Sequence, residues 1–176
     1  MQALTLCTRV WKETRMRTDG ITLVFLTQGK VAIIDSVDAE HILAHKWCFS
    51  GGYAVRNRES PRTGLMVHMH REILSTPNDM ETDHINGNGI DNRRVNLRPA
   101  TPSQNQRNKG LQRNSTSGYK GVCLDKSRGL WLAHIKSGGR FSNLGRFQTA
   151  EEAARAYDTA ARERFGEFAR PNFPEH

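Results

Sequence analysis

The chain has 176 residues, of which 36% are hydrophobic, and its mean hydropathy is −0.66. That length suits one ordinary domain or two small ones. No apolar run approaches the roughly 20 residues that a membrane span needs, so the sequence excludes a transmembrane protein.

The net charge of +8 predicts an anionic partner, with nucleic acid the first candidate and a membrane surface the second. The charge is unevenly distributed. Residues 1–106 carry 13 basic and 11 acidic side chains, whereas residues 107–176 carry 13 basic and 7 acidic ones. We therefore expect the C-terminal part to hold the anionic partner.

The three cysteines, Cys7, Cys48 and Cys123, are far apart and form no CxxC pair. They predict neither a disulfide framework nor a cysteine-type zinc site, and they favour a reducing, cytoplasmic location. Residues 1–20 lack the apolar core and cleavage site of a secretory signal, so we interpret them as a loose leader.

Residues 21–68 predict short elements separated by turns. Two β-rich runs, 21–26 and 31–34, flank Gln28-Gly29 and are typical of a hairpin. A short helix is expected over residues 38–45. Further short strands are expected over residues 47–49, 53–55 and 65–68. This part carries no chemical motif and predicts a small α+β support or a DNA-contacting platform.

The stretch 83–98, DHINGNGIDNRRVNLR, contains two glycines and four asparagines between two short apolar runs. Glycine and asparagine tolerate positive φ, so this composition predicts a hairpin with a long loop. Thr101 then supplies a helix N-cap, Pro102 suits the first helical position, and Gln104 completes a capping box. The expected order is strand, loop, strand, helix.

In that order Asp83 and His84 end the first strand, and Asn105 lies in the first turn of the helix. A helix packed back across the hairpin would aim Asn105 at Asp83. Carboxylate and amide oxygens suit Mg²⁺ or Mn²⁺. Adjacent strand residues face opposite sides, so His84 needs a different role, and an ordinary histidine pKa of about 6.5 suits a general base acting on water.

These residues resemble the HNH (ββα-metal) nucleases, in the phage and homing-endonuclease branch where the last histidine of the name is asparagine. The resemblance implies phosphodiester hydrolysis with one divalent ion, Asp83 and Asn105 as metal ligands, and His84 as general base. It also implies that Asn96 pins the hairpin loop and orients His84. His70 matches a recurrent position of that branch, either structural or touching phosphate.

Two simpler interpretations of the stretch are a capped turn and a calcium loop. The calcium loop fails because the twelfth position from Asp83 is Arg94, where an EF-hand needs a bidentate glutamate. The remaining histidines are expected to be structural or solvent-facing rather than ligands: His41, His45, His68, His134 and His176.

Residues 119–174 predict a second module. Three short strands, over 119–123, 130–136 and 141–147, are expected to form an antiparallel meander. Thr149 and Glu152 form a capping box that begins a helix, and Gly166 ends it. The apolar positions at helical spacing are expected to be core: Ala153, Ala154, Tyr157, Ala160, Ala161 and Phe165.

This module resembles the plant ethylene-response-factor (APETALA-two-type) DNA-binding domain from Tyr119 to Pro174, most clearly over residues 144–158. The resemblance implies a sheet that enters the major groove of duplex DNA, supported from behind by the helix. The plant family has arginines and a tryptophan where this chain has Cys123, Asp125 and Asn143, so the plant target sequence does not carry over. The candidate DNA contacts are Lys120, Lys126, Arg128, His134, Lys136, Arg140, Asn143 and Arg146.

The sequence thus predicts an α+β protein: small N-terminal strands with an HNH ββα-metal motif, then a three-stranded antiparallel sheet packed on one helix. The expected segments are a leader (1–20), an HNH region (21–108, core 67–108), a linker (109–118) and the DNA-binding domain (119–174). The predicted function is a phage or mobile-element homing endonuclease that nicks or cuts duplex DNA as a monomer or weak dimer, in the host cytoplasm. The expected partner is double-stranded DNA, with no membrane and no protein partner. The alternative is a non-catalytic DNA-binding regulator that retains an HNH-like scaffold.

Overall fold

A computed structural model describes residues 17–18, 20–57, 66–111 and 115–174. It is an α+β protein with small antiparallel sheets and few helices, and it divides into two compact units, residues 1–101 and 102–176. Most of the predicted leader lies outside the described residues. Within the residues described, no helix is both long and apolar enough to cross a membrane.

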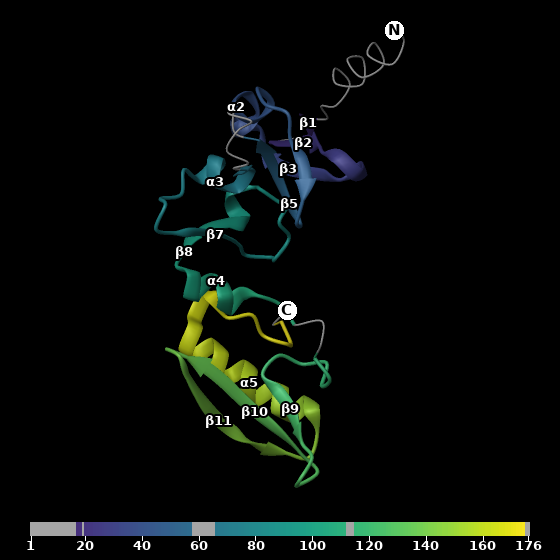
Figure 1. Cartoon of the computed structure of the whole chain (residues 1–176), viewed down its shortest axis with the longest axis vertical. Coiled ribbons are helices and arrows are strands. Elements are labelled where there is room, and N and C mark those ends of the chain that lie inside the picture. Colours follow the sequence, from purple (N-terminus) through teal and green to yellow (C-terminus); the bar gives the residue numbers. More distant parts are fainter. Residues whose placement is uncertain (1–16, 19, 58–65, 112–114, 175–176) are drawn as a thin grey trace. The chain divides into compact units, whose positions relative to one another are not determined.

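The first unit begins with an antiparallel sheet of β1 (Arg17–Thr18), β2 (Ile21–Phe25) and β3 (Val31–Asp35), shown in purple and blue in Figure 1. Alternation along β2 and β3 buries one face, as expected for a half-buried hairpin. The turn Thr27–Gly29 places Gln28 and Gly29 at positive φ. The predicted hairpin is confirmed.

A second sheet follows helix α2 (Ala39–Leu43) and contains β4 (Cys48–Ser50), β5 (Tyr53–Asn57) and β6 (Met66–His68). Helix α3 (Met69–Leu74), which the sequence did not predict, continues directly from β6 and ends at Ser75 in the left-handed region. It escaped prediction because it is less than two turns long and has no side-chain cap. The largest buried side chains of this core are Ile34, Ile42, Trp47 and Met69.

The third sheet of the unit is the two-stranded hairpin of β7 (Glu81–His84) and β8 (Leu97–Ala100). A long loop joins the strands, as predicted, and bonds to β3: Ile33 N donates to Ile90 O at 2.9 Å, and Asn92 N donates to Ile33 O at 2.7 Å. Helix α4 (Pro102–Asn108) follows in sequence and belongs to the second unit. The predicted order of strand, loop, strand and helix is present.

The second unit contains a meander of β9 (Val122–Asp125), β10 (Leu130–Ser137) and β11 (Arg140–Phe147), with β10 in the centre. Helix α5 (Ala150–Phe165) packs on one face of this sheet (Figure 1). Its predicted capping box is present: Glu152 N donates to Thr149 Oγ1 at 3.2 Å, and Thr149 N donates to Glu152 Oε2 at 3.1 Å.

The first strand of this meander starts later than predicted, at Val122 rather than residue 119, and ends at Asp125. Gly121 has φ of +74°, and the space beside it is filled by Tyr157 of α5. The chain therefore turns at Gly121 before it enters the sheet. At Gly121 the backbone therefore lies against the Tyr157 ring of α5.

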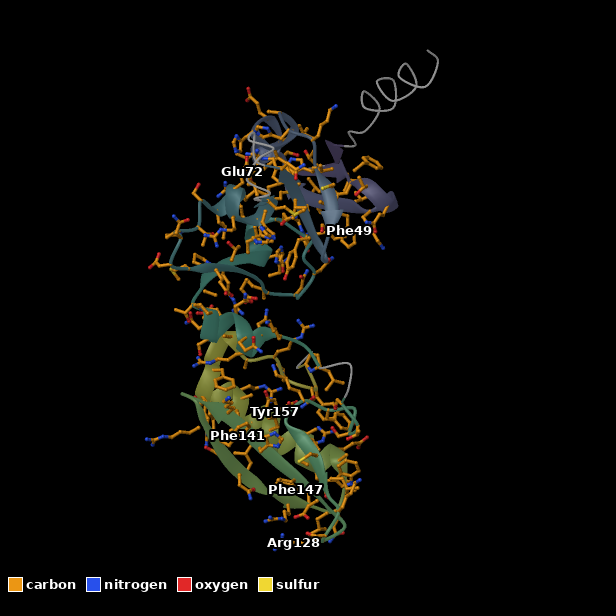
Figure 2. The ribbon with its side chains drawn as sticks, in the orientation of Figure 1. Phe49, Glu72, Arg128, Phe141, Phe147 and Tyr157 are labelled. Carbon is orange, nitrogen blue, oxygen red and sulfur yellow. The ribbon has the colours of Figure 1, made fainter. Side chains whose placement is uncertain are left out.

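The predicted apolar stripe of α5 is core. Its buried members, seen in part around Tyr157 in Figure 2, pack with Val122, Ala133 and Ile135 of the sheet. Trp131 is half-buried against the same core. The buried Asp158 accepts hydrogen bonds from Asn172 N at 2.7 Å and Phe173 N at 2.8 Å, which ties the C-terminal segment to α5.

Candidate functional site

Asp83 and His84 lie at the end of β7, opposite Arg98 and Leu97 of β8. Both are buried, at 3% and 5% exposure. A carboxylate and an imidazole are costly to bury unless each is hydrogen-bonded or paired. Their partners therefore define what each can do.

The ring of His84 is held by Asn92, whose side chain is fully buried in the long loop. His84 Nε2 and Asn92 Oδ1 are 3.2 Å apart. When Nε2–H donates to this oxygen, Nδ1 carries the lone pair of the neutral ring. Burial lowers the pKa of His84, while the Asn92 hydrogen bond and the carboxylates of Asp83 and Asp91 oppose that shift. The ring is thus neutral near pH 7 and has a partner that stabilises a proton once it is accepted.

Two rings contact His84, and a third extends the cluster. His70 meets it edge to face at 4.9 Å between ring centroids, and Tyr53 lies 5.8 Å away. His68 lies 5.1 Å from His70. Burial lowers the pKa of His70 to about 3, so His70 is a neutral ring, and its buried Nδ1 has no hydrogen-bond partner among the described residues. The cluster shields one side of His84 from water without adding charge.

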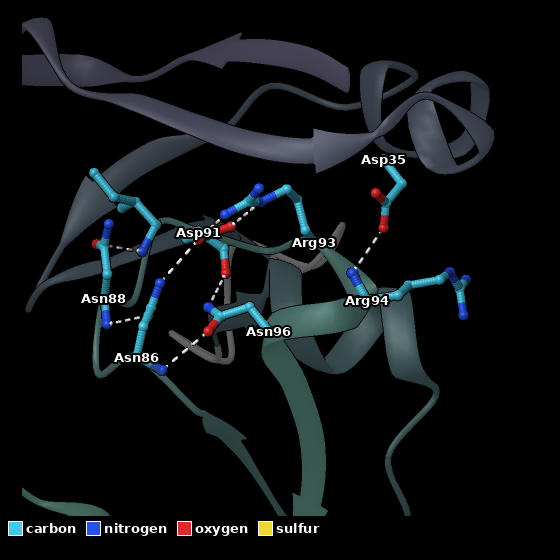
Figure 3. A network of polar contacts seen from close by, with 8 residues as sticks. Asp35, Asn86, Asn88, Asp91, Arg93, Arg94 and Asn96 are labelled. Carbon is cyan, nitrogen blue, oxygen red and sulfur yellow. Dashed lines mark hydrogen bonds and ion pairs between the residues drawn. The ribbon is translucent and has the colours of Figure 1, made fainter. Parts of the chain in front are cut away.

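Asn96 joins the two ends of the long loop (Figure 3). Its Nδ2 donates to Asp91 O at 2.7 Å, and its Oδ1 accepts from Asn86 N at 3.0 Å. Asn86 Nδ2 also donates to Asp91 Oδ2 at 2.9 Å, and Arg93 forks onto both Asp91 oxygens. This pairing holds the pKa of Asp91 below its usual range. The contacts fix the loop that carries Asn92.

The loop is also tied to the first sheet. Arg94 N donates to Asp35 Oδ2 at 2.7 Å, and the Arg94 guanidinium binds both carboxylate oxygens of Asp38. The contacts to Asp35 and Asp38 restrain the loop, and so keep Asn92 in position to bond His84.

The carboxylate of Asp83 is paired with Arg98, whose Nε and Nη2 lie 2.9 and 2.8 Å from Asp83 Oδ2. Asn105, the second predicted ligand, is half-buried in α4 of the second unit. No group of three or more histidine, cysteine or acidic side chains in the described part of the chain could hold a metal ion. A carboxylate and an amide oxygen still fit a hard cation such as Mg²⁺, which keeps several waters and needs few protein ligands.

The predicted DNA contacts lie on the sheet of the second unit and its turns. Lys126 and Arg128 are in the β9–β10 turn (Arg128 is labelled in Figure 2), Lys120 precedes β9, and the others lie on β10 and β11. Lys126, Arg128, Lys136, Arg140, Asn143 and Arg146 are exposed, and His134 is half-buried.

Lys120 has a different environment from the other predicted contacts. Its Nζ donates to the carbonyl oxygens of Arg107 and Lys109, and burial lowers its pKa to about 8. Its ammonium is thus committed to holding the segment after α4, and not displayed on the sheet.

Residues 117–167 match the AP2 domain family. Over 182 residues the chain is 34% identical to an uncharacterized HNH endonuclease of Acanthamoeba polyphaga mimivirus, an alignment that covers 94% of this chain and 91% of that protein. The chain belongs to the HNH endonuclease family.

Two further relatives cover its parts. The chain is 35% identical to Protein 3.8 of Escherichia phage T7 over 94 residues, which is 53% of this chain and 77% of that protein. It is 46% identical to dehydration-responsive element-binding protein 2A of Arabidopsis thaliana over 68 residues, which is 38% of this chain and 20% of that protein. The architecture is an HNH region with an AP2-type domain, and that domain indicates DNA binding.

The side chain that bonds the His84 ring is Asn92, which the sequence did not predict. The resemblance implied that Asn96 pins the hairpin loop and orients His84, and its side chain bonds the loop backbone at Asn86 and Asp91. One signal was present: four asparagines in one loop are more than its turns require. Tyr53 carried no such signal, because its approach to His84 depends on packing between distant segments.

Proposed function

We propose that this chain is a metal-dependent DNA endonuclease that hydrolyses phosphodiester bonds at His84, with the AP2-type domain holding duplex DNA. The observation that carries the proposal is a buried, neutral histidine bonded to Asn92 beside Asp83, at the end of a ββ hairpin in an HNH family member. Relatives from a giant virus and a phage support a mobile-element or phage origin, and action in the host cell cytoplasm.

His84 is the general base of this proposal. Its Nδ1 accepts a proton from the attacking water, and the Asn92 amide oxygen stabilises the imidazolium through Nε2–H. The neutral rings of His70 and Tyr53 exclude water from one side of the base and hold its plane. These rings add no positive charge beside the base, and the Asn92 hydrogen bond and the carboxylates of Asp83 and Asp91 oppose the lowering of its pKa by burial.

HNH endonucleases generally use a divalent metal ion. Asp83 and Asn105, whose side chains offer hard oxygen atoms, remain the proposed ligands of Mg²⁺ or Mn²⁺. When bound, such an ion stabilises the charge that develops on the phosphate and on the departing 3′ oxygen. Arg98 pairs with the Asp83 carboxylate through Nε and Nη2 and fixes its direction.

The remaining exposed basic residues of the second unit, Lys126, Arg128, Lys136, Arg140 and Arg146, supply the phosphate and base contacts of the proposal, with His134 and Asn143 as further base contacts. Lys120 takes a structural role there, because its ammonium is bonded to two carbonyls. If phosphate contacts dominate, log affinity falls linearly with log salt, by about 0.9 per phosphate neutralised.

The test is cleavage of supercoiled plasmid by the full-length protein with Mg²⁺ or Mn²⁺, with DNA binding measured in parallel. His84→Ala should slow cleavage by about 100-fold or more, because a general base commonly contributes that much, and should leave binding unchanged. His41→Ala is the matched control, because His41 is exposed and contacts Glu72 instead of the site. A wild-type protein that binds plasmid and leaves it intact would favour the regulator alternative.

A further inference from the structure

On the sheet of the AP2-type domain, the acidic side chain of Asp125 pairs with two arginines. Its Oδ2 lies 2.9 Å from Arg146 Nε and 3.1 Å from Arg128 Nη1, and its Oδ1 accepts from Ser127 Oγ at 2.6 Å. These bonds hold the pKa of Asp125 far below its usual range. The carboxylate is therefore ionised wherever the protein is folded, in a domain that is otherwise basic.

The register places this group on the sheet face opposite α5. Ala133 and Ile135 are buried against α5, so the alternate residue Leu132 faces away from the helix. Arg146 is the direct partner of Leu132, and Asp125 is the partner of Leu130. Arg146 thus reaches diagonally across β10 from β11 to β9 on the face we name the outer face.

The bond to Asp125 uses Nε of Arg146, and a guanine can be bound by the two terminal amino groups alone. Within the described part of the chain, Nε is the only side-chain atom of Arg146 with a polar partner, so the two terminal amino groups stay available for a ligand. A guanine presents O6 and N7 to the major groove, and a bidentate arginine uses two parallel N–H donors to bind them. A guanidinium fixed in advance loses less conformational entropy on binding.

A base edge suits this pair better than a phosphate does. An ionised carboxylate next to a DNA phosphate is repulsive, whereas Arg140 on the same strand has no acidic partner among the described residues and is free to meet phosphate. The carboxylate beside Arg146 therefore suits that arginine to a base edge, whereas Arg140 suits electrostatic contact with a phosphate.

We propose that Arg146 recognises a guanine in the major groove and that Asp125 is the positioning residue that orients its guanidinium, so that the pair sets a base preference of this domain. The proposal rests on the DNA binding proposed above. It assigns specificity to two positions on the outer face, Asp125 on β9 and Arg146 on β11. Exposed basic residues with no acidic partner in the described part of the chain, such as Arg140, are treated as contacts to the DNA backbone.

The test is selection of bound duplexes from a randomised library, followed by sequencing, with the full-length His84→Ala protein so that the DNA stays intact. We expect one position enriched in guanine. Arg146→Lys keeps the charge but not the fork, and should reduce a preference of about 10-fold to near none at that position while other positions and overall affinity change little. Arg140→Ala, the matched control, should weaken binding evenly across sequences.

Asp125→Asn separates positioning from a structural role. The amide still accepts from Ser127, but the charge that holds Arg146 is lost, so guanine preference should fall several-fold while affinity for unrelated duplex rises, because an anion has left the DNA-facing surface. Loss of both affinity and preference would overturn the proposal, and so would an unchanged preference in Arg146→Lys. A cytosine preference lost in Asp125→Asn and kept in Arg146→Lys would assign recognition to the carboxylate and overturn it as well. If the starting protein binds no duplex, the DNA-binding function itself fails.

Discussion

Replacing Gly121 by alanine probes how tightly α5 is packed against the start of β9. A Cβ at this position would overlap ring atoms Cδ2 and Cε2 of Tyr157 and would lie 2.8 Å from the carbonyl oxygen of His134. Gly118, three residues earlier, has nearly the same φ, +75° against +74°, with nothing within 4 Å of its Cβ position. The two glycines therefore share a conformational cost and differ in steric cost.

The magnitudes follow from this comparison. Alanine in the left-handed region costs about 1–2 kcal/mol, which is the whole expected effect of Gly118→Ala. Gly121→Ala adds the cost of forcing a side chain into a packed core, about 1–3 kcal/mol, and the upper end applies because Tyr157 is only 5% exposed. We expect a total of about 3–5 kcal/mol for Gly121→Ala.

The assay is hydrogen exchange of the β10 amides, which report the second unit alone within the full-length protein. The difference of about 2–3 kcal/mol between the variants corresponds to roughly 30- to 140-fold faster exchange in Gly121→Ala than in Gly118→Ala. The amides of β3, in the first unit, should exchange at wild-type rates in both. Equal effects of the two substitutions would show that Tyr157 can move aside, and would refute the packing argument.

Two further predictions concern the first unit. The pKa of His70 is about 3 in the folded protein and 6.5 in the unfolded chain, so below pH 6.5 the unfolded state binds more protons than the folded state. The contribution of His70 to the free energy of unfolding is therefore complete above pH 6.5 and is lost as the pH falls. It should drop by about 2 kcal/mol between pH 7 and 5. Urea denaturation at the two pH values should show this drop. His70→Gln should remove it, and the exposed control His41→Gln should not. An unchanged pH dependence in His70→Gln would contradict the assignment. Asn96→Ala leaves the N–H of Asn86 and the carbonyl of Asp91 unpaired, so it should lower the free energy of unfolding by about 2–3 kcal/mol, as measured by thermal denaturation. Asn88 is exposed, and Asn88→Ala should cost less than about 1 kcal/mol. Similar losses in both variants would mean that the loop is not held through Asn96.

Much of the local structure followed from the sequence. The β2–β3 hairpin, the order of β7, loop, β8 and α4, and the capped α5 each depend on residues within a few positions of one another. Turn residues, caps and apolar periodicity act at that range, so these elements were predictable. Helix α3 and the late start of β9 were not, because the first is too short to show a period and the second is set by Tyr157 of α5.

The site divides in the same way. The sequence by itself determined the kinds of chemistry available: an Asp-His pair on a hairpin, an asparagine-rich loop, and a basic C-terminal module. Only the tertiary structure decided which side chains meet. Asn92 rather than Asn96 bonds His84, Tyr53 packs on the same ring from another sheet, and the carboxylate on β9 takes an arginine from β11. Such contacts join residues that are neighbours only after the strands pair and the loop is tied down, and no local preference encodes them.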